Sequence, residues 1–287
     1  MSESHPFDIP GRTALSEGNG GLPKITVTTD RSSAEIYLHG AHVTHFQKHG
    51  EPPLLFMSSA SEFHQEKPIR GGVPVIFPWF GPREGLPGHG FARNVEWEIA
   101  GCSILPDESV RIHFQMPAIE FHEVDYFVTV GESLVLELIV ANTSDKDAAF
   151  ENCFHTYFHI ASIDDVSISG LKDCGYYDKV KETGALETAP AIRISSEVDR
   201  VYFDTIVPVE IHDTALGRVI RIEKSGSSST VVWNPWIEKS KRMADFGDDE
   251  YRRMVCVESG NVGKNKIILP PGGRASLKVT LTTASVA

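Results

Sequence analysis

The apolar residues of this chain recur with a period of two, and this alternation constrains the fold more than any other feature. It runs along five stretches, 34–38, 95–99, 110–116, 134–140 and 275–281. Because successive side chains of a β-strand point to opposite faces, each stretch predicts a strand with one buried face. Clusters of Gly, Pro and Asp separate the stretches, and helical turns are predicted only near Ser58–Phe63 and Glu238–Ala244. The sequence therefore predicts an all-β sandwich or barrel.

Charge and composition exclude several classes of protein. The 287 residues carry a net charge of −12, so we expect no broad basic face and no nucleic-acid partner. No apolar run reaches the length of about 18 residues that a membrane-spanning helix needs. The cysteines form no CxxC pair, which is typical of small buried side chains in a reducing compartment; they are Cys102, Cys153, Cys174 and Cys256. We therefore expect a cytoplasmic protein.

The chain shows no internal repeat, no low-complexity linker and no sharp change in composition. We expect one β-sandwich domain over residues 23–287, since single all-β domains of this length are common. Residues 1–22 are polar and rich in Gly and Ser, without the apolar core of a signal peptide. This N-terminal segment is expected to be disordered.

Two neighbouring segments do not resemble scaffold strands. Residues 70–82 contain three prolines and three glycines, and residues 86–93 place His89 and Arg93 beside further glycines. Such a composition weakens a strand and predicts an extended, rigid loop. One interpretation is a buried loop whose arginines pair with core carboxylates. The other is a small-molecule pocket in which Arg70 and Arg93 bind phosphate or carboxylate through bidentate hydrogen bonds.

A third segment, residues 150–159, holds His155 and His159 in the apolar string FENCFHTYFH. Side chains four positions apart can share a face, so a zinc pair is one interpretation. The absence of HExxH and of Cys or Glu at ligand spacing argues against it. A histidine among aromatic residues is often a core residue, but His155 follows the polar Asn152, and a neutral imidazole can act as an acid or base near pH 7.

A carboxylate, Glu258, ends the apolar run Met254–Val257 just before a Gly turn. A buried carboxylate is costly unless it is paired or functional, and burial raises its pKa toward the range of a general base. The nearby Gly263-Lys264 lacks the first Gly and the Ser or Thr of a phosphate-binding P-loop, so that interpretation fails.

Seven collinear strings resemble those of the glucose-6-phosphate 1-epimerases, the hexose-6-phosphate mutarotases of the aldose 1-epimerase superfamily. They are RGGVPVIFPWFG, LPGHGFAR, FHTYFHI, EVDRVY, VVWNPW, MADFGDDEY and MVCVESGNV, within a resemblance that runs from about Ile25 to Leu281. The resemblance implies a galactose mutarotase-like supersandwich of antiparallel strands, with few short helices and an open cleft on one sheet.

The resemblance also implies the roles of particular residues. It makes His155 the catalytic acid and Glu258 the catalytic base. The substrate-binding residues that it implies are Arg70 and Arg93 for the phosphate, Asp199 for sugar hydroxyls, and His89 as a second pocket histidine. Asp178 is the nearby alternative to Asp199.

Two positions depart from the family pattern. Gly88 stands where some members have Gln, which removes a side-chain contact to the sugar. Ser259 replaces the Pro that often follows the catalytic Glu; because Pro fixes φ, Glu258 is expected to be held more loosely in this chain.

Those residues suffice for mutarotation. Glu258 removes the proton of the C1 hydroxyl while His155, entering protonated, protonates the ring oxygen; the ring opens and then closes as the other anomer. Trp79 or Trp233 stacks on the sugar ring. No metal, nucleotide or other cofactor is required. The expected partner is a small-molecule sugar phosphate, with no membrane, and the protein is expected to be a monomer. Glucose, galactose and mannose 6-phosphate all stay open as substrates.

Two other functions fit parts of the sequence. A glycosidase would use Glu258 and Asp199 as its two carboxylates, but the FHTYF string would then have no role. A non-catalytic sugar-phosphate binding or sensing module would keep the pocket and lose the acid–base pair, whereas both members are present.

Overall fold

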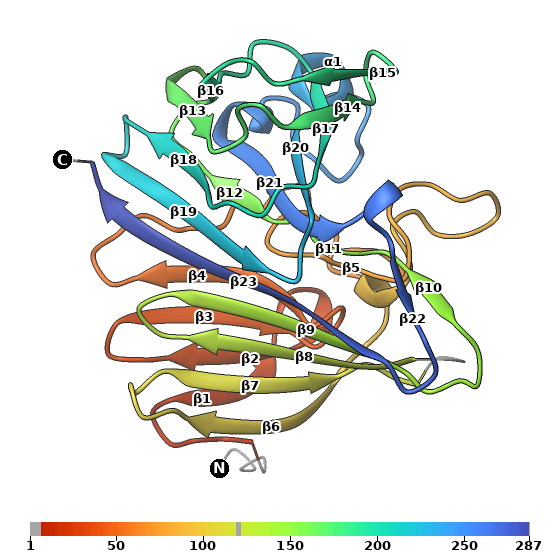
Figure 1. Ribbon diagram of the computed structural model, residues 1–287. Coiled ribbons are helices and arrows are strands. Elements are labelled where there is room, and N and C mark those ends of the chain that lie inside the picture. The colour runs from red at the N-terminus through yellow and green to blue at the C-terminus, as the bar shows by residue number, and fades with distance from the viewer. Residues whose placement is uncertain (1–6, 119–121, 287) are drawn as a thin grey trace.

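Antiparallel β-sheets dominate the computed structural model, which describes residues 7–118 and 122–286 (Figure 1). The all-β prediction is confirmed. All five alternating stretches overlap strands of the structure, and most of their apolar residues are buried. The alternation extends beyond the hydrogen-bonded ladder at some ends; Trp97, for example, is fully buried one residue before its strand begins.

Three large sheets and one small sheet make up the fold. In spatial order, the four-stranded sheet consists of β1 (Thr13–Glu17), β2 (Pro23–Thr28), β3 (Ser32–Tyr37) and β4 (His42–Lys48). The nine-stranded sheet, also in spatial order, consists of β16 (Ala191–Ile192), β13 (Val166–Ser169), β18 (Val209–Asp213), β19 (Arg218–Ser225), β23 (Arg274–Ser285), β9 (Leu134–Asn142), β8 (His122–Val130), β7 (Val110–Gln115) and β6 (Glu98–Ile104).

The eight-stranded sheet contains the strands that matter most for the site. It consists of β15 (Thr183–Leu186), β14 (Gly175–Asp178), β17 (Val198–Phe203), β20 (Ser229–Asn234), β21 (Met254–Asn261), β11 (Asn152–Phe154) and β5 (Val75–Ile76), with β12 (Tyr157–His159) also paired to β21. A two-stranded sheet joins β10 (Ala148–Phe150) to β22 (Ile267–Leu269).

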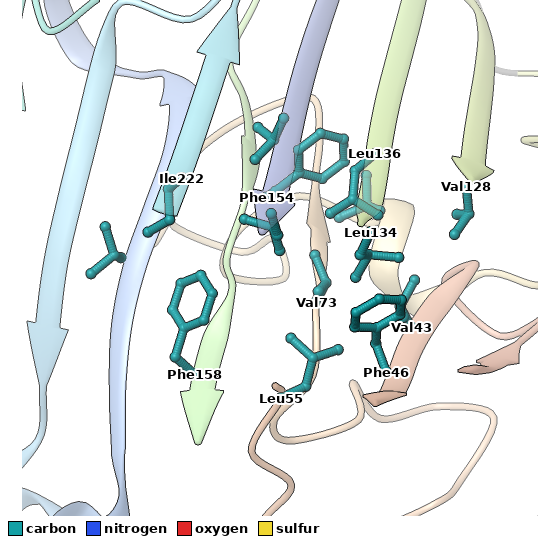
Figure 2. Packing of buried hydrophobic residues seen from close by; sticks show 14 of the residues in the cluster. Val43, Phe46, Leu55, Val73, Val128, Leu134, Leu136, Phe154, Phe158 and Ile222 are labelled. Carbon is teal, nitrogen blue, oxygen red and sulfur yellow. The ribbon is translucent and has the colours of Figure 1, made fainter. Parts of the chain in front are cut away.

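One hydrophobic core is shared by the three large sheets. In Figure 1 the strands β1–β4 lie beside β6–β9, and β3 contacts β8. Figure 2 shows side chains from several sheets converging, among them Phe46 of β4, Leu136 of β9 and Phe154 of β11. Each large apolar side chain buried in this way contributes roughly 1.5–3 kcal/mol. The sandwich is therefore held together by the residues that the alternation identified.

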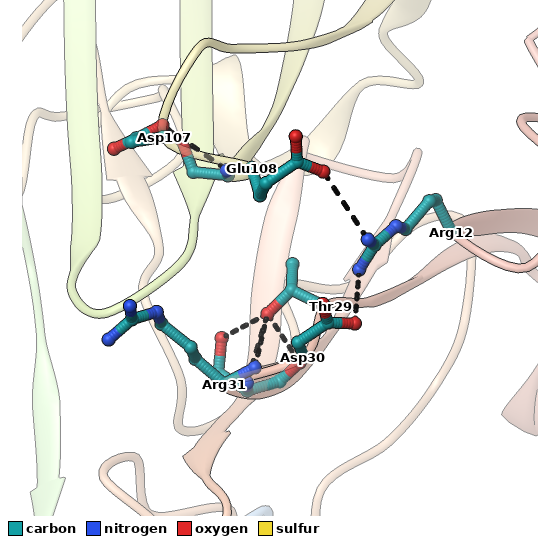
Figure 3. A network of polar contacts seen from close by, with 8 residues as sticks. Arg12, Thr29, Asp30, Arg31, Asp107 and Glu108 are labelled. Carbon is teal, nitrogen blue, oxygen red and sulfur yellow. Dashed lines mark hydrogen bonds and ion pairs between the residues drawn. The ribbon is translucent and has the colours of Figure 1, made fainter.

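Residues 7–22 of the N-terminal segment contain β1 and a 3₁₀ turn, η1 (Asn19–Gly21), and residues 1–6 lie outside the described residues. Arg12, just before β1, reaches two hairpin turns: its guanidinium lies 2.9 Å from the Asp30 carboxylate and 3.5 Å from the Glu108 carboxylate (Figure 3). Asp30 lies between β2 and β3, and Glu108 between β6 and β7. Exposed ion pairs of this kind contribute at most about 1 kcal/mol to the stability of the fold. The segment is therefore held in place mainly by the pairing of β1 with β2.

Helix is sparse, as predicted. The α-helix α1 (Trp236–Ser240) overlaps the predicted turn near Glu238, whereas Ser58–Phe63 forms only a hydrogen-bonded turn from Ser61 N to Ser58 O. Short 3₁₀ turns complete the fold: η2 (Ala92–Asn94), η3 (Ile163–Asp165), η4 (Glu250–Arg253) and η5 (Gly263–Asn265).

Within the described ranges no helix has the length and apolar character needed to span a membrane.

Candidate active site

A cavity of about 280 Å³ lies on one face of the eight-stranded sheet. Alternation along β21 turns Val255 and Val257 into the shared core, and turns Cys256 and Glu258 to the opposite face. The cavity brings together every residue predicted for the site: Arg70, His89, Arg93, His155, Asp199, Trp233 and Glu258. Asp199 of β17, Trp233 of β20 and Glu258 of β21 meet because these neighbouring strands present the same face.

The register of the strands sets the spacing of the proposed acid–base pair. Cys153 of β11 pairs with Gly260 of β21, and Tyr157 of β12 pairs with Cys256. His155 lies between these pairs and is therefore opposite Glu258, with Nε2 and Oε1 3.2 Å apart. Both side chains are almost completely buried.

Glu258 lies inside a strand, and this corrects the expectation that it ends one. Ser259 and Gly260 continue β21, and Ser259 is paired on both sides, to Phe154 and to Thr230. The Ser in place of Pro therefore does not loosen Glu258, because hydrogen bonds to two neighbouring strands fix the backbone there. A proline at this position would have lost its ladder donor.

The segment 70–93, which contains the edge strand β5 of this sheet, supplies four of the residues that line the cavity: Arg70, Phe80, His89 and Arg93. It turns back through Gly90, which has φ +71°; a Cβ there would lie 2.0 Å from the carbonyl oxygen of Phe77. A side chain cannot fit at that position. Of the two tryptophans named for stacking on the sugar, Trp233 lines the cavity, whereas Trp79 lies outside the cavity lining and its Nε1 donates to the Pro87 carbonyl, 3.0 Å away.

His89 is held in an uncommon backbone conformation, with φ +64°. Its Nδ1 accepts a hydrogen bond from the Gly81 N–H, at 3.3 Å, so the ring proton is assigned to Nε2. Burial, helped by the charge of Arg93, lowers the pKa of His89 to about 3. His89 is therefore a neutral ring whose Nε2–H is available to donate a hydrogen bond.

Burial moves the pKa values of the acid–base pair in opposite directions. It raises the pKa of Glu258 well above its ordinary value, and it lowers that of His155 with help from His89 and Arg93. Both shifts reflect the cost of placing a charge away from water. Both shifts therefore favour the uncharged forms of the two groups, whereas the expected reaction uses the Glu258 carboxylate and the His155 imidazolium.

The two arginines differ in their partners. Arg70 donates from Nε and Nη2 to Asp245, at 3.0 and 2.9 Å, and from Nη1 to the Tyr157 hydroxyl, at 2.9 Å. Arg93 donates to the Gly88 carbonyl at 2.7 Å, while its buried Nε has no hydrogen-bond partner. Burial and the charge of Arg70 lower the pKa of Arg93 to about 10. Arg93 is therefore a cation that a ligand anion would stabilise.

Asp199, rather than Asp178, lies in the cavity wall. Burial raises the pKa of Asp199, although Lys179, with Nζ 3.6 Å from its Oδ1, opposes the shift. Asp178 accepts hydrogen bonds from two backbone N–H groups, those of Val180 and Lys181, and pairs with Arg200. Its carboxylate is therefore already occupied.

Sequence reasoning missed several residues that line the cavity, namely Phe80, Tyr157, Lys179, Lys239 and Met243. Tyr157 stacks on His155, with ring centroids 4.9 Å apart, and Lys179 lies over the Phe80 ring. Tyr157 stands in the FHTYF string and could have been included from its spacing to His155. The lysines carry no such signal, because only the pairing of β14 with β17 brings Lys179 to Asp199.

Three of the buried groups are close enough together to hold a metal ion. One ligand atom each from His155, Cys256 and Glu258 lies within 4.8 Å of the others. Cationic side chains surround them in the cavity, Arg70, Arg93, Lys179 and Lys239, and would repel a divalent ion. A zinc-bound histidine also usually donates its second ring nitrogen, whereas Nδ1 of His155 has no partner. These side chains fit proton transfer better than metal binding.

A larger cavity, of about 590 Å³, lies elsewhere on the protein, between Tyr37, His45 and Phe63. None of the residues predicted for the site lines it. Size alone is therefore a poor guide in this protein, and the smaller cavity, with its buried acid–base pair, is the candidate active site.

Comparison with known proteins identifies the family of this chain. The model of the aldose 1-epimerase family matches residues 23–282. A protein of Cenchrus ciliaris named "putative glucose-6-phosphate 1-epimerase" is 35% identical over 270 residues, which cover 88% of this chain and 82% of that protein. A protein of the same name from Escherichia coli K12 is 35% identical over 252 residues, or 83% of each chain.

Solved structures show the same fold. A "putative mutarotase" from Salmonella typhimurium superposes with a TM-score of 0.90 and 28% identity over 97% of this chain and 96% of that one. A galactose mutarotase-like protein from Clostridium acetobutylicum superposes with a TM-score of 0.73 over 95% of this chain and 98% of that one, at 14% identity, and so shows the fold alone. The predicted galactose mutarotase-like supersandwich is confirmed.

Proposed function

Because the chain belongs to the aldose 1-epimerase family, a family of isomerases, we propose that it interconverts the α and β anomers of glucose 6-phosphate and related aldose 6-phosphates. The observation that carries the proposal is the buried His155–Glu258 contact, 3.2 Å long, in the same cavity as Arg93, whose Nε lacks a partner. The contact supplies the proton transfer, and Arg93 supplies the site for a phosphate.

Proton transfers open and close the sugar ring. Glu258 as carboxylate takes the proton of the C1 hydroxyl, and His155 as imidazolium gives a proton to the ring oxygen, so that the C1–O5 bond breaks and an aldehyde forms. Rotation about the C1–C2 bond presents the other face, and the reverse transfers close the ring. General acid–base steps of this kind contribute about 10²–10⁴-fold each. The protons and bonds balance without a cofactor.

The phosphate has a second role in this proposal. Burial and the charges of Arg93 and Arg70 oppose protonation of His155. A phosphate dianion bound by Arg93 offsets those charges, so it raises the pKa of His155. Binding of the substrate would thus favour the imidazolium that the reaction needs.

The remaining cavity residues bind the sugar. Asp199 accepts hydrogen bonds from its hydroxyls, His89 donates from Nε2, and Trp233 offers an apolar face. Arg70 supports this arrangement by holding Tyr157, which stacks on His155. The cytoplasmic location and the monomeric state expected from the sequence stay part of the proposal.

The test is anomer exchange followed by NMR saturation transfer at neutral pH, with glucose 6-phosphate and glucose compared at equal concentration. We expect fast exchange of the phosphate ester, slower exchange of glucose, and loss of both in Glu258→Gln. Equal exchange of the two sugars would contradict the role of Arg93. Exchange at the spontaneous rate for both sugars would contradict the proposed activity and favour a binding module.

A further inference from the structure

The two oxygens of the Glu258 carboxyl group have different neighbours. Oε1 faces Nε2 of His155, whereas Oε2 lies 3.6 Å from Sγ of Cys153, within hydrogen-bonding distance for a thiol donor. Cys153 belongs to β11 and is completely buried. The thiol is therefore a fixed contact that distinguishes one carboxyl oxygen from the other.

The strand register explains why the thiol reaches this oxygen. His155 lies directly opposite Glu258, and Cys153 lies two residues earlier on the same face, in the diagonal position. Diagonal neighbours in a sheet are close enough for side chains to touch. The contact is thus set by the backbone of two paired strands.

We propose that Cys153 is a positioning residue of the reaction: its thiol binds Oε2, and so leaves Oε1 as the oxygen that exchanges the proton with substrate. The inference rests on the proposed function, in which Glu258 is the general base. It assigns a role in the chemistry to a side chain that composition alone marks as a small core residue.

The chemistry of a thiol suits this position. A buried carboxylate without any donor is costly, but strong donors stabilise the anion so far that it becomes a poor base. A thiol is a weak donor and lies between these extremes. The other titratable or charged groups around Glu258 are His155, Tyr157, Lys179, Asp199, Arg93 and Cys256, and a Cys153 substitution alters none of these side chains.

The chain provides a matched control. Cys256 is also completely buried and also lies beside Glu258, two residues away on β21. The hydrogen bond to the carboxyl group comes from Cys153 and not from Cys256. Removal of each thiol in turn therefore separates the hydrogen bond from the loss of a buried sulfur atom.

The experiment is the pH profile of kcat/KM for anomer exchange in four proteins: the wild type, Cys153→Ala, Cys153→Val and Cys256→Ala. A hydrogen bond to the charged form lowers a carboxyl pKa, so its loss raises the pKa of Glu258 and moves the limb of the profile that Glu258 sets to higher pH. We expect a shift of about half a pH unit in both Cys153 variants, the low end of the scale for one hydrogen bond, because a thiol is a weak donor. The limb of Cys256→Ala should stay at the wild-type position.

Alanine is smaller than cysteine and valine is larger, so a shift of the pH profile in the same direction in both variants is caused by loss of the thiol donor. Should one of them fail to fold in a thermal melt, the other still provides the comparison. An unmoved limb in a folded Cys153 variant, or an equal shift in Cys256→Ala, would overturn the inference. Failure of the proposed function is distinguishable, because the wild type itself would then show no exchange above the spontaneous rate.

Discussion

The two faces of the eight-stranded sheet share their strands and differ in almost everything else. On one face Phe154, Val232 and Val257 join the shared hydrophobic core. On the other face His155, Trp233 and Glu258 line the cavity. Immediate neighbours in the sequence therefore carry opposite tasks, because each step along a strand changes the face. In this sheet, residues on the core face stabilise the fold, and the alternating residues on the other face line the cavity.

The largest effect that separates the faces is expected for Glu258→Gln. Loss of a general base lowers kcat for anomer exchange by about 10²–10⁴-fold. The free energy of unfolding should not fall, because a neutral amide replaces a carboxyl group that burial disfavours in its charged form. NMR exchange and urea unfolding measure the two quantities. If Glu258→Gln also lowered the free energy of unfolding, the proposed separation between the cavity face and the core face would be wrong.

Phe154→Ala is the reciprocal change, one residue from His155 on the core face. Truncation of a buried Phe costs about 3–5 kcal/mol of unfolding free energy. Urea unfolding measures this loss, and kcat per folded molecule should stay within a few-fold of the wild type. A loss of kcat as large as that of Glu258→Gln would show that the core face also sets the chemistry.

Two substitutions sharpen the comparison within the cavity. Arg93→Met removes a cation that lacks an ion-pair partner within the described residues, so KM for glucose 6-phosphate should rise about 10–100-fold, the scale of a charged hydrogen bond. Exchange of unphosphorylated glucose should change little.

Arg70→Met should lower kcat more than it raises KM, because Arg70 holds Tyr157 against His155. The same NMR assay at varied substrate concentration separates the two constants.

The smallest effect concerns a charge on the core side. Lys224 of β19 donates to Thr205, Thr230 and the Ser229 carbonyl across the sheets. Burial lowers its pKa to about 8, below the unfolded value. Between pH 8 and 10 the unfolded chain binds more protons at this site, so stability rises with pH. Relative to Lys224→Met, the wild type should gain about 1–2 kcal/mol between pH 7 and 9.5 in urea unfolding.

Much of the fold was predictable, because alternation is a local property that a sequence displays directly. Leu134–Val140 and Ala275–Leu281 lie in β9 and β23 as expected. The site was predictable only in part. His155, Glu258 and the arginines carry recognisable strings, whereas Lys179 reaches the cavity through a strand pairing that no local pattern reveals.

Protonation was the other feature that the sequence did not disclose. The expected imidazolium at His155 ignores the burial and the neighbouring cations that disfavour it. The sequence alone also does not distinguish Arg70 from Arg93, because both are arginines beside glycine-rich strings. Their difference lies in Asp245, a residue far along the chain whose carboxylate pairs with Arg70.

The continuous register of β11 and β12 along β21 has a consequence for how such a protein can change over evolutionary time. Loops between strands can lengthen or shorten without moving His155 away from Glu258. One residue gained or lost between Cys153 and Tyr157 would turn a phenylalanine toward the substrate and a histidine toward the core. Descendants of this sequence are therefore free to vary their loops, but they must conserve the count of residues within these strands.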